Sequence, residues 1–399
     1  MKLKELFDKT TFLIGAGASM DAECLSSSAM LKNLKLANLQ LDKPDENGHY
    51  SKYKDFQKQF TEIYDFIVAS LNYQFTLKDS TFNVSQNLNV EDFVMVLKQI
   101  IDREYIVPYP LVGNWNDKIT KWELSNNNND IFREFLNFIV TLLTSKWTSI
   151  NPAKAKSLLS PIRYLLNSSE NFKLKIFSLN YDLVFENTLG SLSENLIETG
   201  FTSEYVSKEI IKVWNDAAFS DENSKSKLHL YKLHGSLNWE YDHFFELIKE
   251  KQLLNDGKEP LIIFGSANKM LSFDPFLFFL SEFRKRLSSS SLIVVIGYSF
   301  HDKYINNLLI QQLQQSNTRR MIIVDPFPMA DKETEFASRL ETIQTIRSVN
   351  DLINFKKANH EKIKIIKLST KKFLSTYFSN KAEMLKALVA DAEKEDTLF

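Results

Sequence analysis

The sequence predicts an α/β fold: a Rossmann-like, mainly parallel sheet with helices on both faces and a large helical insertion. Short, continuously apolar runs recur along the chain, as is typical of buried strands. Longer mixed segments separate these runs, as helical crossovers do in a parallel sheet. Half of the ten glycines follow apolar runs, where a strand ends in a tight turn. The expected strands are Thr11–Ile14, Leu174–Phe177, Leu230–Leu233, Leu261–Phe264, Leu292–Ile296, Met321–Val324 and Ile363–Lys367.

The amino-acid composition argues against a nucleic-acid-binding, a membrane, or a disulfide-linked protein. The 399 residues, 44% hydrophobic and 25% charged, are enough for two domains and an ordinary globular core. The net charge of -1 provides no overall basic field, so we expect no direct nucleic-acid binding. No apolar run is long enough for a membrane span or a signal peptide, so we expect a cytoplasmic protein with no membrane contact. The single cysteine, Cys24, excludes an intrachain disulfide and a multi-cysteine zinc site.

The first two expected strands are far apart in the sequence. About 160 residues lie between Ile14 and Leu174, and apolar side chains recur there at helical spacing, as in Val90–Arg103 and Ile131–Lys146. We therefore expect residues 36–165 to form a helical insertion that covers the carboxyl edge of the sheet as a lid. Residues 1–35 and 166–399 would then form the Rossmann-like domain.

A glycine-rich loop, Gly15–Ser19, follows the first expected strand. Gly15 permits a tight turn, and Gly17 would let the backbone approach a pyrophosphate at the start of the next helix. The third glycine of the dinucleotide-binding fingerprint is missing. A simple glycine turn between strand and helix is therefore an equally good interpretation.

Polar residues follow the second expected strand. Asn180 could hydrogen-bond a ribose hydroxyl or hold a water molecule, because ligands of open α/β sheets bind at the carboxyl ends of the strands. Alternatively, Asn180 caps a turn. For Asp182 we favour a structural role, as the N-cap of a helix at Leu183–Asn187.

His234 follows the third expected strand and precedes Gly235 and Ser236, which place it in a turn at the strand end. Histidine is the side chain best suited to proton transfer near neutral pH, so His234 is a candidate acid or base. The other histidines lack this setting, and we expect structural roles for them. They are His49, His229, His243, His301 and His360.

Two later strand ends complete the set. Gly297 would pass close to a nucleotide and Ser299 would donate to a phosphate, while Asp302 is expected to cap the following helix, Lys303–Gln311. Asp325 also ends a strand, where a carboxylate commonly binds the adenosine-ribose hydroxyls.

In this order the motifs resemble the bacterial sirtuin-like NADase domains of anti-phage defence. The resemblance spans nearly the whole chain at motif level, and five separated motifs rarely recur in order by chance. The motifs are Gly15–Ser19, Asn180-Tyr181-Asp182, Leu233-His234-Gly235-Ser236 with Asn238-Trp239, Phe264-Gly265-Ser266 with Asn268-Lys269, and Gly297-Tyr298-Ser299-Phe300 with Asp302.

The resemblance implies an NAD hydrolase that cleaves NAD to nicotinamide and ADP-ribose without a metal and depletes the cofactor of an infected cell, as in abortive infection. It implies that Asn180 and His234 are the catalytic pair. NAD is the substrate. Its expected contacts are Gly15, Ala16, Gly17, Ser19, Asp182, Gly235, Ser236, Gly297, Tyr298, Ser299 and Asp325.

The chain departs from related families at two points. The sirtuin-like NADases usually follow the glycine loop with a glycine and a proline, whereas this chain has Met20–Leu25. Protein-deacylating sirtuins carry a four-cysteine zinc ribbon, which Cys24 alone cannot form. Two alternatives stay open: an NAD-dependent protein deacylase, and a non-catalytic sensor of NAD or ADP-ribose that acts through assembly.

Regulation is expected as well. An unregulated NADase would kill its own host, so we expect a homo-oligomer whose activity is gated by assembly or by a partner. By resemblance, a HerA-like hexameric ATPase is the first candidate partner.

Overall fold

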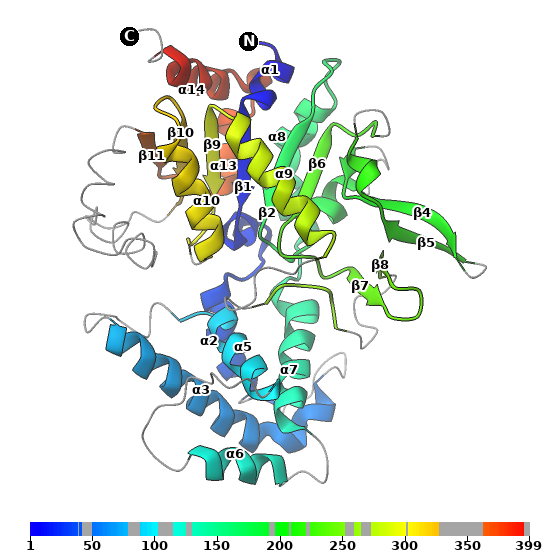
Figure 1. Ribbon diagram of the computed structural model, residues 1–399, viewed down its shortest axis with the longest axis vertical. Helices are drawn as coiled ribbons and strands as arrows, with labels where there is room; N and C mark the ends of the chain where they lie inside the picture. The colour runs from blue at the N-terminus through cyan, green and yellow to red at the C-terminus, as the bar shows by residue number, and fades with distance from the viewer. Residues whose placement is uncertain are drawn as a thin grey trace.

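A seven-stranded parallel sheet forms the centre of the molecule, with the strand order β11-β10-β9-β1-β2-β6-β3 (Figure 1). The computed structural model describes residues 1–38, 40–41, 50–78, 88–102, 115–124, 130–190, 196–206, 209–220, 224–251, 259–264, 273–300, 302–326 and 362–394. The strands are β1 (Thr10–Ile14), β2 (Leu174–Ser178), β3 (Ile197–Glu198), β6 (Leu228–Lys232), β9 (Leu292–Ile296), β10 (Arg320–Val324) and β11 (Ile363–Ile366).

The strand order confirms the predicted Rossmann-like fold. From the central β1 the chain adds β2 and β6 on one side, then crosses over to add β9, β10 and β11 on the other. The order of addition reverses between β1 and β9. In open α/β sheets such a switch point is where ligands bind, in the crevice outside the carboxyl ends of the strands.

The side chains of each strand alternate between two hydrophobic clusters. On β1, Phe12 and Ile14 face one cluster and Leu13 faces the other. Helices on both faces complete three layers, with α9 and α10 in front of the sheet in Figure 1 and α8 and α13 behind it. These helices and the two at the top of the view are α1 (Leu3–Asp8), α8 (Pro152–Leu166), α9 (Phe276–Ser289), α10 (Lys303–Gln314), α13 (Thr370–Tyr377) and α14 (Glu383–Lys394).

A group of helices lies beyond the carboxyl edge of the sheet (Figure 1). Its hydrophobic cluster also takes in Tyr181, Leu237 and Phe264 from loops of the sheet, so the two parts share a core. In the part of residues 15–173 that the structure describes, there is no strand. The helices are α2 (Ser27–Asn38), α3 (Gln57–Lys78), α5 (Val90–Ile101), α6 (Trp115–Leu124) and α7 (Ile131–Leu142).

Helix α8 falls within the expected insertion, residues 36–165, but packs elsewhere. Its buried side chains, among them Leu158 and Ile162, belong to the cluster of the sheet rather than to that of the helical group. Conversely, Met30 and Leu34, before the expected boundary, belong to the helical cluster. We propose that the insertion starts at α2 and ends before Pro152.

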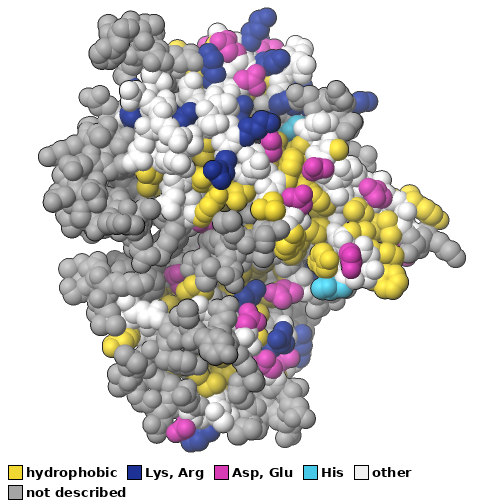
Figure 2. Space-filling view, viewed as in Figure 1, with side chains coloured by type: hydrophobic (Ala, Val, Ile, Leu, Met, Phe, Trp, Pro, Cys, Tyr) yellow, Lys and Arg dark blue, Asp and Glu magenta, His cyan; other side chains and the backbone are white. Residues whose placement is uncertain are grey.

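A second, antiparallel sheet was not predicted. It has the order β4-β5-β8-β7 and lies beside the main sheet (Figure 1). Its strands are only partly buried, so they lack the continuous apolar runs on which the prediction depended. Apolar side chains gather over this sheet and the adjoining α9 (Figure 2). Tyr205, Ile210 and Phe244, in or next to its strands, are exposed. The strands are β4 (Phe201–Val206), β5 (Glu209–Trp214), β7 (Trp239–Asp242) and β8 (Leu247–Glu250).

One predicted strand is wrong. Leu261–Phe264 forms no strand of the parallel sheet; Ile262 makes only an isolated antiparallel bridge to Gly235. The reason is that its backbone groups pair with the turn at His234: the N–H of Ile263 donates to the carbonyl of His234 at 2.8 Å. The segment therefore supports a loop of the sheet edge. Among the residues that the structure describes, no helix is long and apolar enough to cross a membrane.

Candidate functional site

Four loops meet at the carboxyl edge of the sheet, after β1, β2, β6 and β9. Two hydrogen bonds connect them in pairs. The amide Nδ2 of Asn180, after β2, donates to the Oγ of Ser19, after β1, at 3.0 Å. The Nε2 of His234, after β6, lies 3.0 Å from the Oδ2 of Asp302, after β9. Parallel strands bring these residues to one edge although they are far apart in the sequence.

Asn180 is held in one orientation. Its side chain is buried, with 5% of the residue exposed, and Nδ2 is bonded to Ser19. Its backbone N–H donates to the Oγ of Ser178 at 3.1 Å. Within the described residues, Oδ1 has no hydrogen-bond partner. The amide therefore presents a buried acceptor that a ligand can use. Ser19, an expected NAD contact, accepts the hydrogen bond that orients Asn180.

His234 has a similar arrangement. It is 5% exposed, its Nε2 faces Asp302, and Nδ1 has no partner in the part of the chain that the structure describes. The next residue, Gly235, has a φ of +81°, and a Cβ there would lie 2.2 Å from the carbonyl oxygen of Leu261. Glycine is therefore required to turn the chain directly after the histidine.

A buried lysine supports the loops that carry Asn180 and His234. Lys232 ends β6, and its Nζ lies 2.9 Å from the Oε1 of Glu186 and 2.9 Å from the Oγ of Ser236. It also donates to the backbone carbonyls of Tyr181 and Asp182. Burial raises the pKa of Glu186 even though Lys232 opposes the shift. Ser236, an expected NAD contact, is fully buried and accepts a hydrogen bond from Lys232. Its contact with NAD stays a prediction.

The glycine loop packs against the loop after β9. The N–H of Gly17 donates to the carbonyl of Gly297 at 2.9 Å, and the N–H of Gly15 donates to that of Ile296 at 2.9 Å. A Cβ on Gly17 would lie 2.8 Å from the Gly297 oxygen, and Gly297 itself has a φ of +60°. The glycines thus allow two backbones to touch across the switch point.

The glycine loop leads into a short 3-10 helix, η1 (Ala16–Ala22), rather than the expected α-helix. The N–H of Ala18 donates to the carbonyl of Gly15, so three N–H groups of the loop already have acceptors. A pyrophosphate contact through those groups requires the loop to rearrange. That contact stays a prediction.

The remaining expected NAD contacts are spread along the same edge. Ala16 is half-buried and Ser299 is exposed. The Oδ1 of Asp182 accepts from the N–H of Val184 at 3.1 Å, shortly before the π-helix η4 (Glu186–Gly190). Tyr298 is buried, with its hydroxyl 2.9 Å from the Oδ1 of Asn306. Asp325 is half-buried at the end of β10. The motif residues Gly265, Ser266, Asn268 and Lys269, and His301, lie outside the described residues.

Sequence reasoning missed two features of the site. Asp302 caps α10 as expected, with Oδ1 accepting from the N–H groups of Tyr304 and Ile305, but it also holds His234. The second feature is Lys232, whose supporting contacts the sequence did not predict. Its position, at the end of a buried and mainly apolar strand, could have indicated a role. Lysine is almost never fully buried without partners, so a buried lysine there implies partners in the neighbouring loops.

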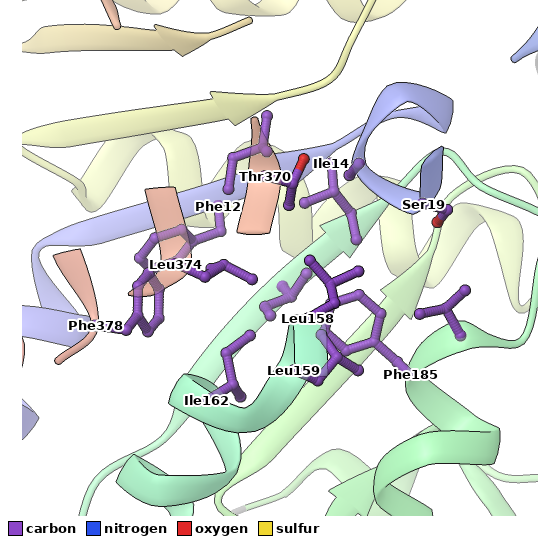
Figure 3. A pocket seen from close by; sticks show the side chains of 14 residues that line it. Phe12, Ile14, Ser19, Leu158, Leu159, Ile162, Phe185, Thr370, Leu374 and Phe378 are labelled. Carbon is purple, nitrogen blue, oxygen red and sulfur yellow. The ribbon is translucent and has the colours of Figure 1, made fainter. Parts of the chain in front are cut away.

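An apolar cavity of about 20 Å³ lies behind the glycine loop, between the sheet and helices α8 and α13 (Figure 3). Ile14, Leu158 and Leu374 line it, and Ser19 lies at its border, whereas Asn180 and His234 are not among the lining residues. The volume is enough for about one water molecule, and the walls offer it few polar partners. This cavity is a packing gap and not the ligand site.

Two further observations concern metal-ligand groups and the single cysteine. Across the described ranges, no group of three or more His, Cys, Asp or Glu side chains could hold a metal ion. Burial raises the pKa of Cys24 to about 12. Its thiol therefore stays protonated at neutral pH and is a poor nucleophile.

Part of the chain matches a known family. A family model described as a SIR2-like domain matches residues 174–346, which run from β2 to beyond β10 and include Asn180, His234 and Asp302. The match supports a sirtuin-like family for this part of the chain, and SIR2-like domains bind NAD and are often NAD-utilising enzymes. No curated protein matches the chain.

Proposed function

We propose that this protein is an NAD hydrolase that cleaves NAD to nicotinamide and ADP-ribose. One observation carries the proposal: Asn180 Oδ1 and His234 Nδ1 are buried and have no partner within the described residues, while the other polar atom of each side chain is fixed. Leaving a buried polar atom unpaired costs about 1–3 kcal/mol. A ligand can complete the hydrogen bonds of these two atoms, and the ribose hydroxyls of NAD are suitable partners.

The chemistry needs little from the protein. Nicotinamide departs as a neutral ring with the electron pair of the bond to the ribose, so no acid has to protonate it. The sugar becomes electron-poor, as in other glycoside cleavages, and water adds to the same carbon with loss of one proton. Asn180 orients the water or a ribose hydroxyl, and His234 accepts a hydroxyl proton, directly or through water.

In the cell, we propose that this reaction depletes NAD during phage infection of a bacterium and that it takes place in the cytoplasm. Support for this role comes from the order of the motifs, which resembles that of the sirtuin-like defence NADases. We further propose that the protein acts as a homo-oligomer and that a HerA-like ATPase is its first candidate partner. The proposed role includes no direct contact with nucleic acid or a membrane.

The test is incubation of the purified protein with NAD and chromatographic measurement of nicotinamide and ADP-ribose. Asn180→Ala and His234→Ala should each lower the rate about a hundredfold to ten-thousandfold, the usual effect of losing a positioned catalytic group. Asn38→Ala is the matched control. Asn38 is also buried, with its Nδ2 bonded to Thr61 and its Oδ1 unpartnered within the described residues, but it lies on α2 in the helical group.

Each alternative gives a different result. Nicotinamide release that requires an acyl-lysine peptide would identify a deacylase. Binding of NAD without turnover in the assembled protein would identify a sensor. If both single variants keep full activity while circular dichroism shows an intact fold, the assignment of the site is wrong.

A further inference from the structure

The carboxylate of Asp302 holds two groups at once. Its Oδ1 accepts from the backbone N–H groups of Tyr304 at 2.9 Å and Ile305 at 3.2 Å, in the first turn of α10. Its Oδ2 lies 3.0 Å from Nε2 of His234. The side chains of His234 and Asp302 are only 6% and 3% exposed. The carboxylate cannot swing away from the histidine without losing the helix cap.

This contact decides where the imidazole carries its hydrogen. An ionised carboxylate can only accept hydrogen bonds, so Nε2 of His234 must be the donor. In the neutral ring the lone pair then lies on Nδ1. Nδ1 is the buried atom that has no partner in the described part of the chain.

We propose that Asp302 is the positioning residue that selects this tautomer and thereby makes Nδ1, rather than Nε2, the nitrogen of His234 that accepts the hydroxyl proton. The inference rests on the proposed NAD hydrolysis, because it names the reacting atom of that site. Asp302 itself touches neither the substrate nor the transferred proton.

The loop after β9 is braced so that Asp302 stays in place. The hydroxyl of Tyr298 lies 3.1 Å from both the backbone nitrogen and the carbonyl oxygen of Asp302, and 2.9 Å from Oδ1 of Asn306. The amide of Asn306 in turn donates to the carbonyl of Phe300 at 2.7 Å. A loop on one side of β1 thus fixes the orientation of His234, which belongs to a loop on the other side.

The test is the substitution Asp302→Asn in the full-length protein. An asparagine can keep its Oδ1 on the helix cap and place its amide where Oδ2 was, so that it donates to Nε2 of His234. This arrangement stabilises the opposite tautomer, with the hydrogen on Nδ1. Asp130→Asn is the matched control, because Asp130 caps α7 in the same way, accepting from Phe132 at 3.1 Å and Arg133 at 3.2 Å.

Two readouts separate positioning from a purely structural role. Nitrogen-15 NMR of histidine-labelled protein at neutral pH, assigned with a His234→Gln sample, reports the tautomer. We expect hydrogen on Nε2 in the unsubstituted protein and in Asp130→Asn, and on Nδ1 in Asp302→Asn. In the NAD assay, Asp302→Asn should lower kcat by up to about 10⁴-fold, as a histidine base in the wrong tautomer does. KM should change little.

The outcomes are distinct. A change of tautomer together with a lower kcat supports the proposal. A lower kcat with an unchanged tautomer means that Asp302 acts only as a cap, and hydrogen on Nδ1 in the unsubstituted protein overturns the proposal outright. If the unsubstituted protein does not cleave NAD, the proposed function fails, whereas the NMR comparison still decides whether Asp302 selects the tautomer.

Discussion

Gly17 and Gly297 lie in contact, backbone against backbone, where the loops after β1 and β9 meet. Gly17→Ala would place a methyl group 2.8 Å from the Gly297 oxygen, which is fixed in the backbone. We expect the free energy of unfolding to fall by about 1–3 kcal/mol, the usual cost of overpacking. Urea denaturation measures this change, and the NAD assay should show a parallel loss because the same loop orders Ser19.

Gly190→Ala provides the comparison for Gly17. A Cβ at Gly190 would meet only the side chain of Ile197, at 3.7 Å, which is ordinary contact. This variant should unfold at nearly the same urea concentration as the unsubstituted protein. Equal stability of the two alanine variants would show that the loops after β1 and β9 can move apart and accept the added methyl group without cost.

His229 gives the protein a dependence of stability on pH. It is fully buried on β6, and burial, followed by the charges of Lys173 and Lys175, lowers its pKa from 6.5 to about 3. Between these values the unfolded chain binds a proton that the folded chain excludes. The contribution of His229 to stability is therefore full above pH 6.5 and is lost as the pH falls towards 3, by up to about 1.4 kcal/mol per pH unit.

Urea unfolding at pH 7 and pH 5 measures this effect. The unsubstituted protein should lose more stability between the two pH values than His229→Gln does. The control His243→Gln changes a histidine outside the hydrophobic clusters and should behave like the unsubstituted protein. The same loss in all three proteins would show that His229 is protonated in the fold.

At the scale of single residues, the sequence predicted which residues belong to the candidate site but not which of them are in contact. Asn180 and His234 could be predicted because each is a polar residue at the end of a buried apolar strand. The pairing of His234 with Asp302 spans 68 positions and that of Lys232 with Glu186 spans 46. No local pattern links positions so far apart, so these contacts appear only once the sheet order is known. Whether Asn180 and His234 bind NAD stays a prediction.

Among the elements, α5 of the helical group contacts the loop after β2 through the side chain of Tyr181. The hydroxyl of Tyr181 lies 2.8 Å from the carbonyl oxygen of Ile263 and 3.1 Å from Oε1 of Glu91 on α5. Tyr181→Phe would remove the single hydroxyl hydrogen that these two acceptors share, and the Ile263 carbonyl is buried. We expect the free energy of unfolding to fall by about 1–3 kcal/mol. NAD cleavage should fall too, because Tyr181 is the neighbour of Asn180.

A tyrosine inside the helical group provides the control for this variant. The hydroxyl of Tyr53 lies 3.2 Å from Oγ1 of Thr141, and both residues belong to the helical group. Tyr53→Phe should change stability by a smaller amount and leave the rate of NAD cleavage unchanged. A rate in Tyr181→Phe equal to that of Tyr53→Phe would mean that the helices do not act on the loop of Asn180.

Strands were predictable where both faces of the sheet are covered. There, every side chain must be apolar, and runs such as Leu292–Ile296 stand out in the sequence. Each strand of the small sheet has only one or two buried residues, so these strands carry no such run. Leu261–Phe264 has an apolar run for another reason: it fills the space between the His234 turn and the helical cluster.

For the whole molecule, the proposed gating by assembly predicts that activity depends on concentration. Nicotinamide released per chain should rise as the protein is concentrated, in step with the mass measured by light scattering. Asn180→Ala at the same concentrations measures background hydrolysis, and a HerA-like ATPase can be added as a second arm. A monomer with constant, full activity at every concentration would contradict the proposal.

The central place of β1 also affects how the protein is made. Thr11, in β1, is hydrogen-bonded to Ser290, just before β9, although the two are 279 positions apart. At about 5–20 residues per second, a ribosome needs on the order of 15–60 s to make the intervening chain. Until then β1 has no neighbour on that side, and Asp302 has not yet been added beside His234. A growing chain therefore cannot acquire the proposed NAD-cleaving activity before β9 and Asp302 have been made.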